Sequence, residues 1–144
     1  MKIIIDADAC PVLDITLEMA RKRDISAIIV SDNAHFIVRE GAKTVTVDKG
    51  TDSADLKIAN IAERNDIVVT QDYGLAALCL AKGARALNQN GLIFTDENIE
   101  NLLHSRFMAK KARLAGKRIK GPSKRTELND RDFIRSLTLL LEES

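Results

Sequence analysis

The sequence predicts an α/β protein with three layers (α/β/α), in which helices cover both faces of a mainly parallel sheet. Short apolar runs alternate along the chain with helix-patterned stretches, as expected of parallel strands joined by right-handed crossovers. Only 3% of the residues are aromatic whereas 45% are hydrophobic, so the core must be built from Ile, Leu, Val and Ala. Such a core suits a parallel sheet covered by helices. The length fits a single domain over residues 1–144.

The first elements are a strand, a helix and a second strand. Residues 2–7 form a short apolar run that ends in acid, and Pro11 stands where a helix can begin at its first position. The helical pattern continues to the charged run at 21–23, and residues 25–30 then predict a second buried strand. This order indicates a parallel pair of strands with a helical crossover.

The middle of the chain predicts two more strands and two helices. β-branched residues at 44–47 indicate a third strand, and a glycine breaks the chain before a helical stretch at 53–64. The apolar run at 67–70 predicts the fourth strand. The next helix, over 73–82, is short and largely apolar, so we expect it to be well buried.

The last third of the chain predicts edge strands followed by two helices. Strand-like residues at 86–87 and 92–94 flank a turn-forming sequence, which indicates a hairpin or an edge extension. Asp96 resembles a helix N-cap, and its helix should run on to Gly116. After a loop that contains Gly and Pro, residues 132–142 predict a final amphipathic helix.

Aspartates follow several predicted strands, at the ends where parallel sheets bind ligands. Asp6 and Asp8 follow the first strand, and Asp72 comes just after the fourth, where a turn-forming role is the alternative. Asp52 and Asp55 stand near the start of a helix, where an N-cap or the helix dipole would also explain them. No capping geometry explains both Asp6 and Asp8, so at least one of them is a functional candidate.

Such a cluster of carboxylates predicts a divalent-metal site. Like charges brought together cost free energy unless a cation neutralises them. Carboxylate oxygens are hard ligands that suit Mg²⁺ or Mn²⁺. One or two such ions could position and activate a water molecule and stabilise the charge that develops on a phosphodiester oxygen.

Three sequence stretches carry a resemblance to a known family. Residues 6–12 (DADACPV), 50–55 (GTDSAD) and 68–76 (VVTQDYGLA) resemble the YaiI/YqxD-like family of uncharacterised bacterial proteins, which is PIN-like. The resemblance implies a PIN-like fold and a metal-dependent nuclease, although it names no substrate. As the nucleic-acid partner we expect RNA in preference to DNA. It covers nearly the whole chain, because it continues through residues 82–88, 98–99, 121–122 and 130–133.

The resemblance also implies which acids are catalytic. PIN nucleases place one Asp after the first strand, an acid at the start of a helix and another Asp after a Val-Thr strand. A fourth acid is common in that superfamily, and here Asp8, Asp52 and Asp96 compete for the role. The three catalytic places are matched by Asp6, Asp55 and Asp72.

A basic segment from Arg106 to Arg125 holds nine Lys or Arg residues and no acid. The formal net charge of the chain is only +1, so attraction to nucleic acid must come from this uneven distribution. Such residues neutralise phosphates without reading sequence, although a solvated helix face would have the same composition. The nucleic-acid-binding residues that we expect are Arg106, Lys110, Lys111, Arg113, Lys117 and Arg118.

Two other functions fit the same residues. A haloacid-dehalogenase-like phosphatase would use Asp6 and Asp8 as nucleophile and acid. Thr70 would end its later strand and Lys82 would be its cation, but the acids at 96–97 are a poor match for its paired metal ligands. A non-catalytic module that binds RNA or a protein partner would keep the sheet and the basic segment without turnover.

The composition also bears on the cellular compartment. Cys10 and Cys79 are too few for a disulfide framework and lack the spacing of a zinc site, so they are interpreted as thiols in a reducing compartment. The sequence shows no signal-peptide pattern and no apolar run long enough to span a bilayer. We therefore expect a cytoplasmic protein with no membrane partner.

Overall fold

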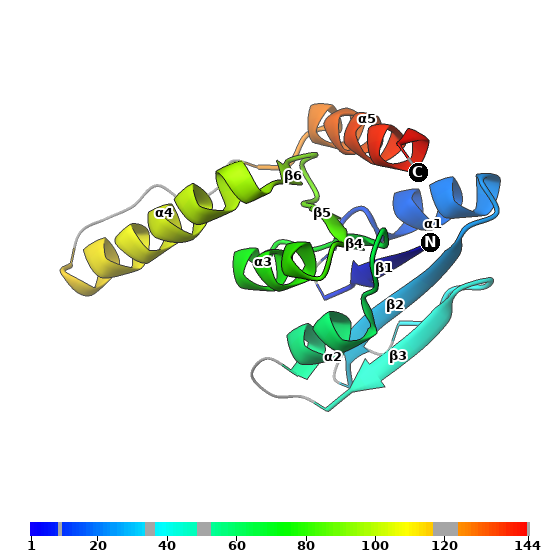
Figure 1. Cartoon of the computed structure of the whole chain (residues 1–144), viewed down its shortest axis with the longest axis horizontal. Coiled ribbons are helices and arrows are strands. Elements are labelled where there is room, and N and C mark those ends of the chain that lie inside the picture. The colour runs from blue at the N-terminus through cyan, green and yellow to red at the C-terminus, as the bar shows by residue number, and fades with distance from the viewer. Residues whose placement is uncertain (9, 34–36, 49–52, 117–123, 144) are drawn as a thin grey trace.

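The computed structural model describes residues 1–8, 10–33, 37–48, 53–116 and 124–143. It contains a single sheet flanked by helices (Figure 1). The strands are β1 (Lys2–Asp6), β2 (Ser26–Asp32), β3 (Lys43–Val47), β4 (Ile67–Val69), β5 (Arg85–Leu87) and β6 (Ile93–Phe94). The helices are α1 (Leu13–Lys22), α2 (Ser53–Ile61), α3 (Tyr73–Ala81), α4 (Asp96–Leu114) and α5 (Glu127–Glu142).

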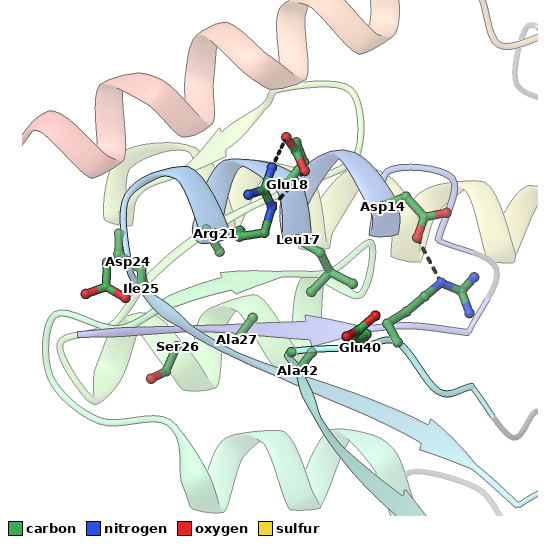
Figure 2. A pocket seen from close by; sticks show the side chains of 13 residues that line it. Asp14, Leu17, Glu18, Arg21, Asp24, Ile25, Ser26, Ala27, Glu40 and Ala42 are labelled. Carbon is green, nitrogen blue, oxygen red and sulfur yellow. Dashed lines mark hydrogen bonds and ion pairs between the residues drawn. The ribbon is translucent and has the colours of Figure 1, made fainter.

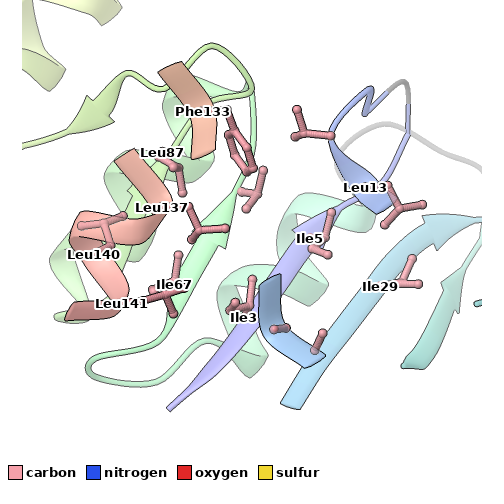
Figure 3. Close-up of a cluster of buried hydrophobic side chains, with 14 of the residues drawn as sticks. Ile3, Ile5, Leu13, Ile29, Ile67, Leu87, Phe133, Leu137, Leu140 and Leu141 are labelled. Atoms are coloured by element: carbon pink, nitrogen blue, oxygen red, sulfur yellow. The ribbon is translucent and has the colours of Figure 1, made fainter. Parts of the chain in front are cut away.

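Helices cover both faces of the sheet, which confirms the predicted three-layer α/β/α architecture. Side chains alternate along β1, because successive residues of a strand point to opposite faces. Ile3 and Ile5 pack in the core that includes α1 and α5, whereas Ile4 packs in the core that includes α2 and α3. Figure 3 shows the first of these cores, with Phe133 and Leu137 of α5 facing the sheet.

The strand order places a crevice beside β1. The order is β3-β2-β1-β4-β5-β6, and all neighbouring strands are parallel except β6, which is antiparallel to β5. β2 and β4 therefore lie on opposite sides of β1, with α1 on one face of the sheet and α2 on the other. A chain that reverses its strand order in this way leaves room for a ligand outside the carboxyl ends of the strands.

Several predicted boundaries were wrong at the helix ends. The first helix begins at Leu13, because residues 11–12 form a turn in place of the helical start predicted at Pro11. The last helix begins at Glu127, five residues before the predicted start. The prediction missed its first turn because that turn is largely polar and shows no apolar pattern.

The prediction that the third helix is well buried holds for one face only. In α3, Leu75 is buried, whereas Leu78 is 52% exposed.

The predicted edge hairpin is confirmed, with β5 and β6 joined by residues 88–92. In the part of the chain that the structure describes, no helix combines the length and the apolar character needed to cross a membrane.

Candidate functional site

Asp6 and Asp72 are joined at the crevice by the hydroxyl of Thr70. Thr70 Oγ1 donates a hydrogen bond to Asp6 Oδ2 over 2.9 Å and accepts one from the Asp72 backbone N–H over 3.0 Å. Thr70 is 2% exposed, so its hydroxyl is held in place by the core. Sequence reasoning treated Thr70 only as the end of a strand, since a β-branched residue there already has a structural explanation.

Asp72 also begins α3. Its Oδ1 accepts a hydrogen bond from the Leu75 backbone N–H over 3.0 Å, which makes Asp72 the N-cap. On its other side the Asp72 carboxylate hydrogen-bonds to the side chain of Asp55, in the first turn of α2. Two carboxyl groups hydrogen-bond only when a proton lies between them. The structure thus brings Asp55 and Asp72 into contact, across elements that are separate in the sequence.

Asp6 occupies an environment that disfavours its charge. Burial raises the pKa of Asp6, and repulsion from the carboxylates of Asp8 and Asp72 raises it further. The hydrogen bond from Thr70 opposes these effects but does not cancel them, so the pKa of Asp6 lies above its usual value. Asp6 is therefore more easily protonated in the folded protein than an ordinary aspartate is.

The opposite balance holds at Asp72. Burial acts to raise its pKa, but hydrogen bonds from Asp55 and from the Leu75 backbone outweigh burial, and the charge of Arg106 adds to them. The pKa of Asp72 consequently lies below its usual value. A pair of nearby carboxyl groups with pKa values shifted apart can divide the roles of proton carrier and permanent anion.

A cavity of about 590 Å³ contains these carboxylates and part of the predicted basic surface. One side is formed by the strand ends and the start of α3, and α4 forms the other. Positive and negative side chains therefore share one cavity, which suits a ligand that carries an anionic group. The lining residues are Asp6, Gln71, Asp72, Tyr73, Leu102, Ser105, Arg106, Ala109 and Arg113.

The basic residues predicted to bind nucleic acid fall into three groups. Arg106 and Arg113 line the carboxylate cavity. Lys110 and Lys111 are exposed on the same helix but do not line it. The remaining two, Lys117 and Arg118, lie outside the described residues. Sequence spacing could not show which arginines turn toward the acids, because that depends on the direction in which α4 leaves the sheet.

The three competitors for a fourth acidic position are placed differently. Asp8 is half-buried and close enough to Asp6 to raise its pKa. Asp52 lies outside the described residues. Asp96 is exposed at the first position of α4, and the predicted N-cap role at Asp96 was wrong. Thr95 is the N-cap instead: its Oγ1 accepts the Asn98 backbone N–H over 3.1 Å.

The acids that the structure describes suit a divalent ion by the chemistry of their donor atoms but not by their arrangement. Their donors are hard carboxylate oxygens, which suit Mg²⁺ or Mn²⁺. Within the described ranges, however, no three His, Cys, Asp or Glu side chains are arranged to hold an ion. A metal bound by Asp55 and Asp72 would replace the proton between them, because carboxylates bind metals in their ionised form.

The phosphatase alternative is not supported at Lys82. This residue caps the C-terminal end of α3, whereas Asp72 caps its N-terminal end. The Lys82 ammonium donates hydrogen bonds to the carbonyl groups of Ala59 and Asn60 in α2. The cation that this mechanism would need beside Asp6 is therefore committed at the opposite end of the helix.

A separate cavity of about 530 Å³ lies between α1, β2 and residues 39–42 (Figure 2). Two ion pairs neutralise part of its charge. Arg39 Nε lies 2.8 Å from Asp14 Oδ1, and Arg21 Nη2 lies 2.6 Å from Glu18 Oε1. None of the predicted site residues lines this cavity.

The two cysteines have the properties of packed thiols: Cys79 is buried and Cys10 is half-buried. Burial raises the pKa of Cys79 to about 11 and also raises the pKa of Cys10. Both thiols therefore stay protonated at neutral pH, which leaves them poor nucleophiles.

Comparison with known proteins identifies relatives over the whole chain. Residues 4–143 match the sequence profile of an uncharacterised bacterial family, YaiI/YqxD. A UPF0178 protein from Exiguobacterium sibiricum is 50% identical, over 99% of this chain and 98% of that protein. A UPF0178 protein from Ruminiclostridium cellulolyticum is 47% identical, over 99% and 93%. A crystal structure of Rae1 (YacP) from Bacillus subtilis matches 100% of both chains with 18% identity and a TM-score of 0.46.

Proposed function

This chain belongs to the YaiI/YqxD family of uncharacterised bacterial proteins, and we propose that it is a divalent-metal-dependent nuclease that favours RNA over DNA. The observation that carries the proposal is the shared cavity. Asp6 and Asp72 line it on one side and Arg106 and Arg113 on the other. Hydrolysis of a phosphodiester needs cations that hold the phosphate beside groups that manage protons, and this cavity contains both.

Each group in the cavity has a proposed role. Arg106 and Arg113 hold the phosphate by charge-assisted hydrogen bonds. Asp72 favours its ionised form, because its pKa is lowered, and the buried, repelled charge that raises the pKa of Asp6 would be stabilised by a bound cation. Thr70 fixes the position of Asp6 relative to Asp72 through its two hydrogen bonds.

The proposed metal ligands are Asp6, Asp55 and Asp72, with Asp8 and Asp52 as helpers. When bound, Mg²⁺ or Mn²⁺ would supply an activated water and stabilise developing negative charge on the phosphate. Lys110 and Lys111 extend the positive charge along α4 beyond the cavity, which favours a polymer over an isolated phosphate ester.

The first experiment compares two substitutions at one position. Asp72→Asn removes the charge but retains a good N-cap, so we expect RNA cleavage to fall at least about 100-fold with stability nearly unchanged. Asp72→Ala removes the cap as well and should also cost about 1 kcal/mol of stability. Cleavage of labelled RNA and DNA oligonucleotides would be measured with Mn²⁺, Mg²⁺ or EDTA, alongside urea unfolding.

Asp14→Asn is the matched control, because it removes an exposed carboxylate in the other cavity. It should leave cleavage unchanged. Cleavage that persists in EDTA, or that survives in the Asp72→Asn protein, would refute the proposal and indicate a contaminating nuclease.

Metal binding has a test that does not depend on cleavage. Mn²⁺ at about 100 times its dissociation constant should stabilise the native protein by roughly 2.7 kcal/mol. The same addition should release protons into a weakly buffered solution, since the ion replaces the proton between Asp55 and Asp72. Neither effect is expected in the Asp72→Asn protein. The non-catalytic module would be favoured if the protein binds RNA but neither cleaves it, nor is stabilised by Mn²⁺, nor releases protons when Mn²⁺ is added.

A further inference from the structure

A second pocket adjoins the carboxylate cavity along the carboxyl ends of β4 and β5. It has a volume of about 530 Å³, and Gln71 and Tyr73 line both spaces. Five of its seven lining side chains are primary amides, and we refer to it as the amide pocket. Its remaining residues come from the turn after β5 and from around the start of α5: Asn88, Gln89, Asn90, Arg125 and Asn129.

Hydrogen bonds fix the orientation of three of these amides. Asn88 Oδ1 accepts the backbone N–H groups of Asn90 and Leu92, both over 2.9 Å. Asn129 Oδ1 accepts the Thr126 backbone N–H over 2.9 Å. A backbone N–H can only donate, so in both side chains the bonded atom must be the oxygen.

The third amide is fixed in the same way by an arginine. Asn90 Oδ1 accepts a hydrogen bond from Arg125 Nη1 over 2.8 Å, and a guanidinium can only donate. Throughout the described ranges, the amide nitrogens of Asn88, Asn90 and Asn129 have no protein acceptor. The pocket is therefore rich in unused N–H donors, whereas the matching oxygens are already occupied.

The charge of this pocket is nearly balanced. Arg125 Nη2 lies 2.6 Å from Asp130 Oδ1, and Arg125 Nε donates to the same oxygen over 3.1 Å. Because this carboxylate offsets the guanidinium, the pocket lacks the excess positive charge that would hold a phosphate. A neutral ligand with carbonyl acceptors fits it better. Tyr73 adds an aromatic ring, which packs edge to face against Phe94 with 5.7 Å between ring centroids.

We propose that the amide pocket binds a keto-bearing nucleobase, uracil or guanine, of the strand whose phosphodiester lies at the carboxylates. Gln71 and Tyr73 are shared by the two spaces, so one nucleotide can place its phosphate in the first and its base in the second. The keto oxygens of uracil and guanine can accept hydrogen bonds from the amide N–H groups of the pocket. Cytosine and adenine carry an exocyclic amino group at the corresponding position, and this group is itself a donor, so it cannot bond to the amide N–H groups. This inference rests on the proposed function for the identity of the polymer.

The test measures binding in EDTA, so that cleavage does not contribute. The full chain should bind a fluorescent uridine hexanucleotide about tenfold more tightly than the cytidine hexanucleotide, as measured by anisotropy. Asn129→Asp keeps the oxygen that accepts the Thr126 N–H and replaces the NH₂ donor by an acceptor. This substitution should reverse the preference toward cytidine. Asn60→Asp introduces the same charge at an exposed position of α2 and should leave the preference intact.

A second readout locates the base directly. Uridine monophosphate should shift the side-chain NH₂ resonances of Asn88, Asn90 and Asn129, whereas ribose 5-phosphate and inorganic phosphate should not. Equal binding of the two hexanucleotides, no binding of either, or an unchanged ratio in the Asn129→Asp protein would overturn the inference. A uridine preference without Mn²⁺-dependent cleavage would support the inference while refuting the nuclease. Mn²⁺-dependent cleavage without a base preference would support the nuclease and refute base binding in the amide pocket.

Discussion

Asp6 shows how a functional carboxylate is retained at a cost in stability. It ends a strand in which the three preceding residues, Ile3 to Ile5, are fully buried, and it lies near two other acids. Its folded-state pKa lies above the ordinary value of 3.8, so the folded protein binds more protons than the unfolded chain between the two values. Stability therefore falls as pH rises through that interval and remains lower at neutral pH.

Asp6→Asn should consequently stabilise the metal-free protein at pH 7. The amide retains an oxygen that can accept the hydrogen bond from Thr70, while the unfavourable charge is removed. Well below pH 3.8 the part of the difference that comes from the charge should vanish, because Asp6 is then protonated in both the folded and unfolded states. Thermal unfolding in EDTA across the pH range measures the effect. A loss of stability at pH 7 would show that the charge of Asp6 is favourable in the fold.

At the scale of single elements, the start of α4 depends on a reciprocal pair of hydrogen bonds. Thr95 Oγ1 accepts the Asn98 backbone N–H, and Asn98 Oδ1 accepts the Thr95 backbone N–H over 2.9 Å. Asn98 also donates from its amide nitrogen to the Ile93 carbonyl over 2.9 Å, which connects the helix to β6. This first turn sets the direction in which α4 runs from the sheet.

Substitutions at Thr95 and Asp96 measure separately how much the N-cap hydrogen bond and the neighbouring negative charge contribute to stability. Thr95→Ala should destabilise the protein by about 1 kcal/mol, because it leaves the Asn98 N–H without its acceptor. Asp96→Ala removes only a favourable interaction with the helix dipole and should cost about 0.3 kcal/mol. Urea unfolding of both variants measures the difference. A larger loss for Asp96→Ala would restore Asp96 as the cap.

The order of the helices and strands could be predicted from the sequence, but some of their first and last residues could not. Apolar runs predicted β1, β2 and β4, because burial on both faces requires such residues, whereas β3 was predicted from its β-branched residues although none of them is fully buried. Asp96 and Thr95 are both common capping residues, and only the observed hydrogen bonds distinguish them. The acids were found because strand ends meet at one edge, whereas the cavity-facing arginines and the amide pocket depend on how α4 and α5 pack.

At the scale of the whole molecule, α5 packs closely against the turn between β5 and β6. Gly91 has φ +86°, and a Cβ added there would lie 2.4 Å from the Asp132 carbonyl oxygen. Ser136 Oγ also donates a hydrogen bond to the Gly91 carbonyl. The C-terminal helix thus holds the turn that supplies part of the amide pocket.

Gly91→Ala should therefore affect both stability and base binding. We expect a loss of at least about 2 kcal/mol, because the substitution combines an unfavourable φ with a backbone clash. The uridine preference should also decline, since the turn and α5 both contribute to the amide pocket. Gly41→Ala is the control, with φ +82° but no atom within 4 Å of the added Cβ. Equal losses in the two variants would mean that backbone strain alone accounts for the effect.

α4 is anchored near its N-terminal end by the buried Ile99, and it extends away from the sheet (Figure 1). Its 19 residues span about 28 Å, yet Ile99 is its only buried residue among those described. Arg106 and Arg113 stand progressively farther from this anchor. Any bending of the helix about this anchor would displace the outer arginine more than the inner one. We therefore expect the position of Arg113 to adjust more readily than that of Arg106 when the cavity binds a ligand.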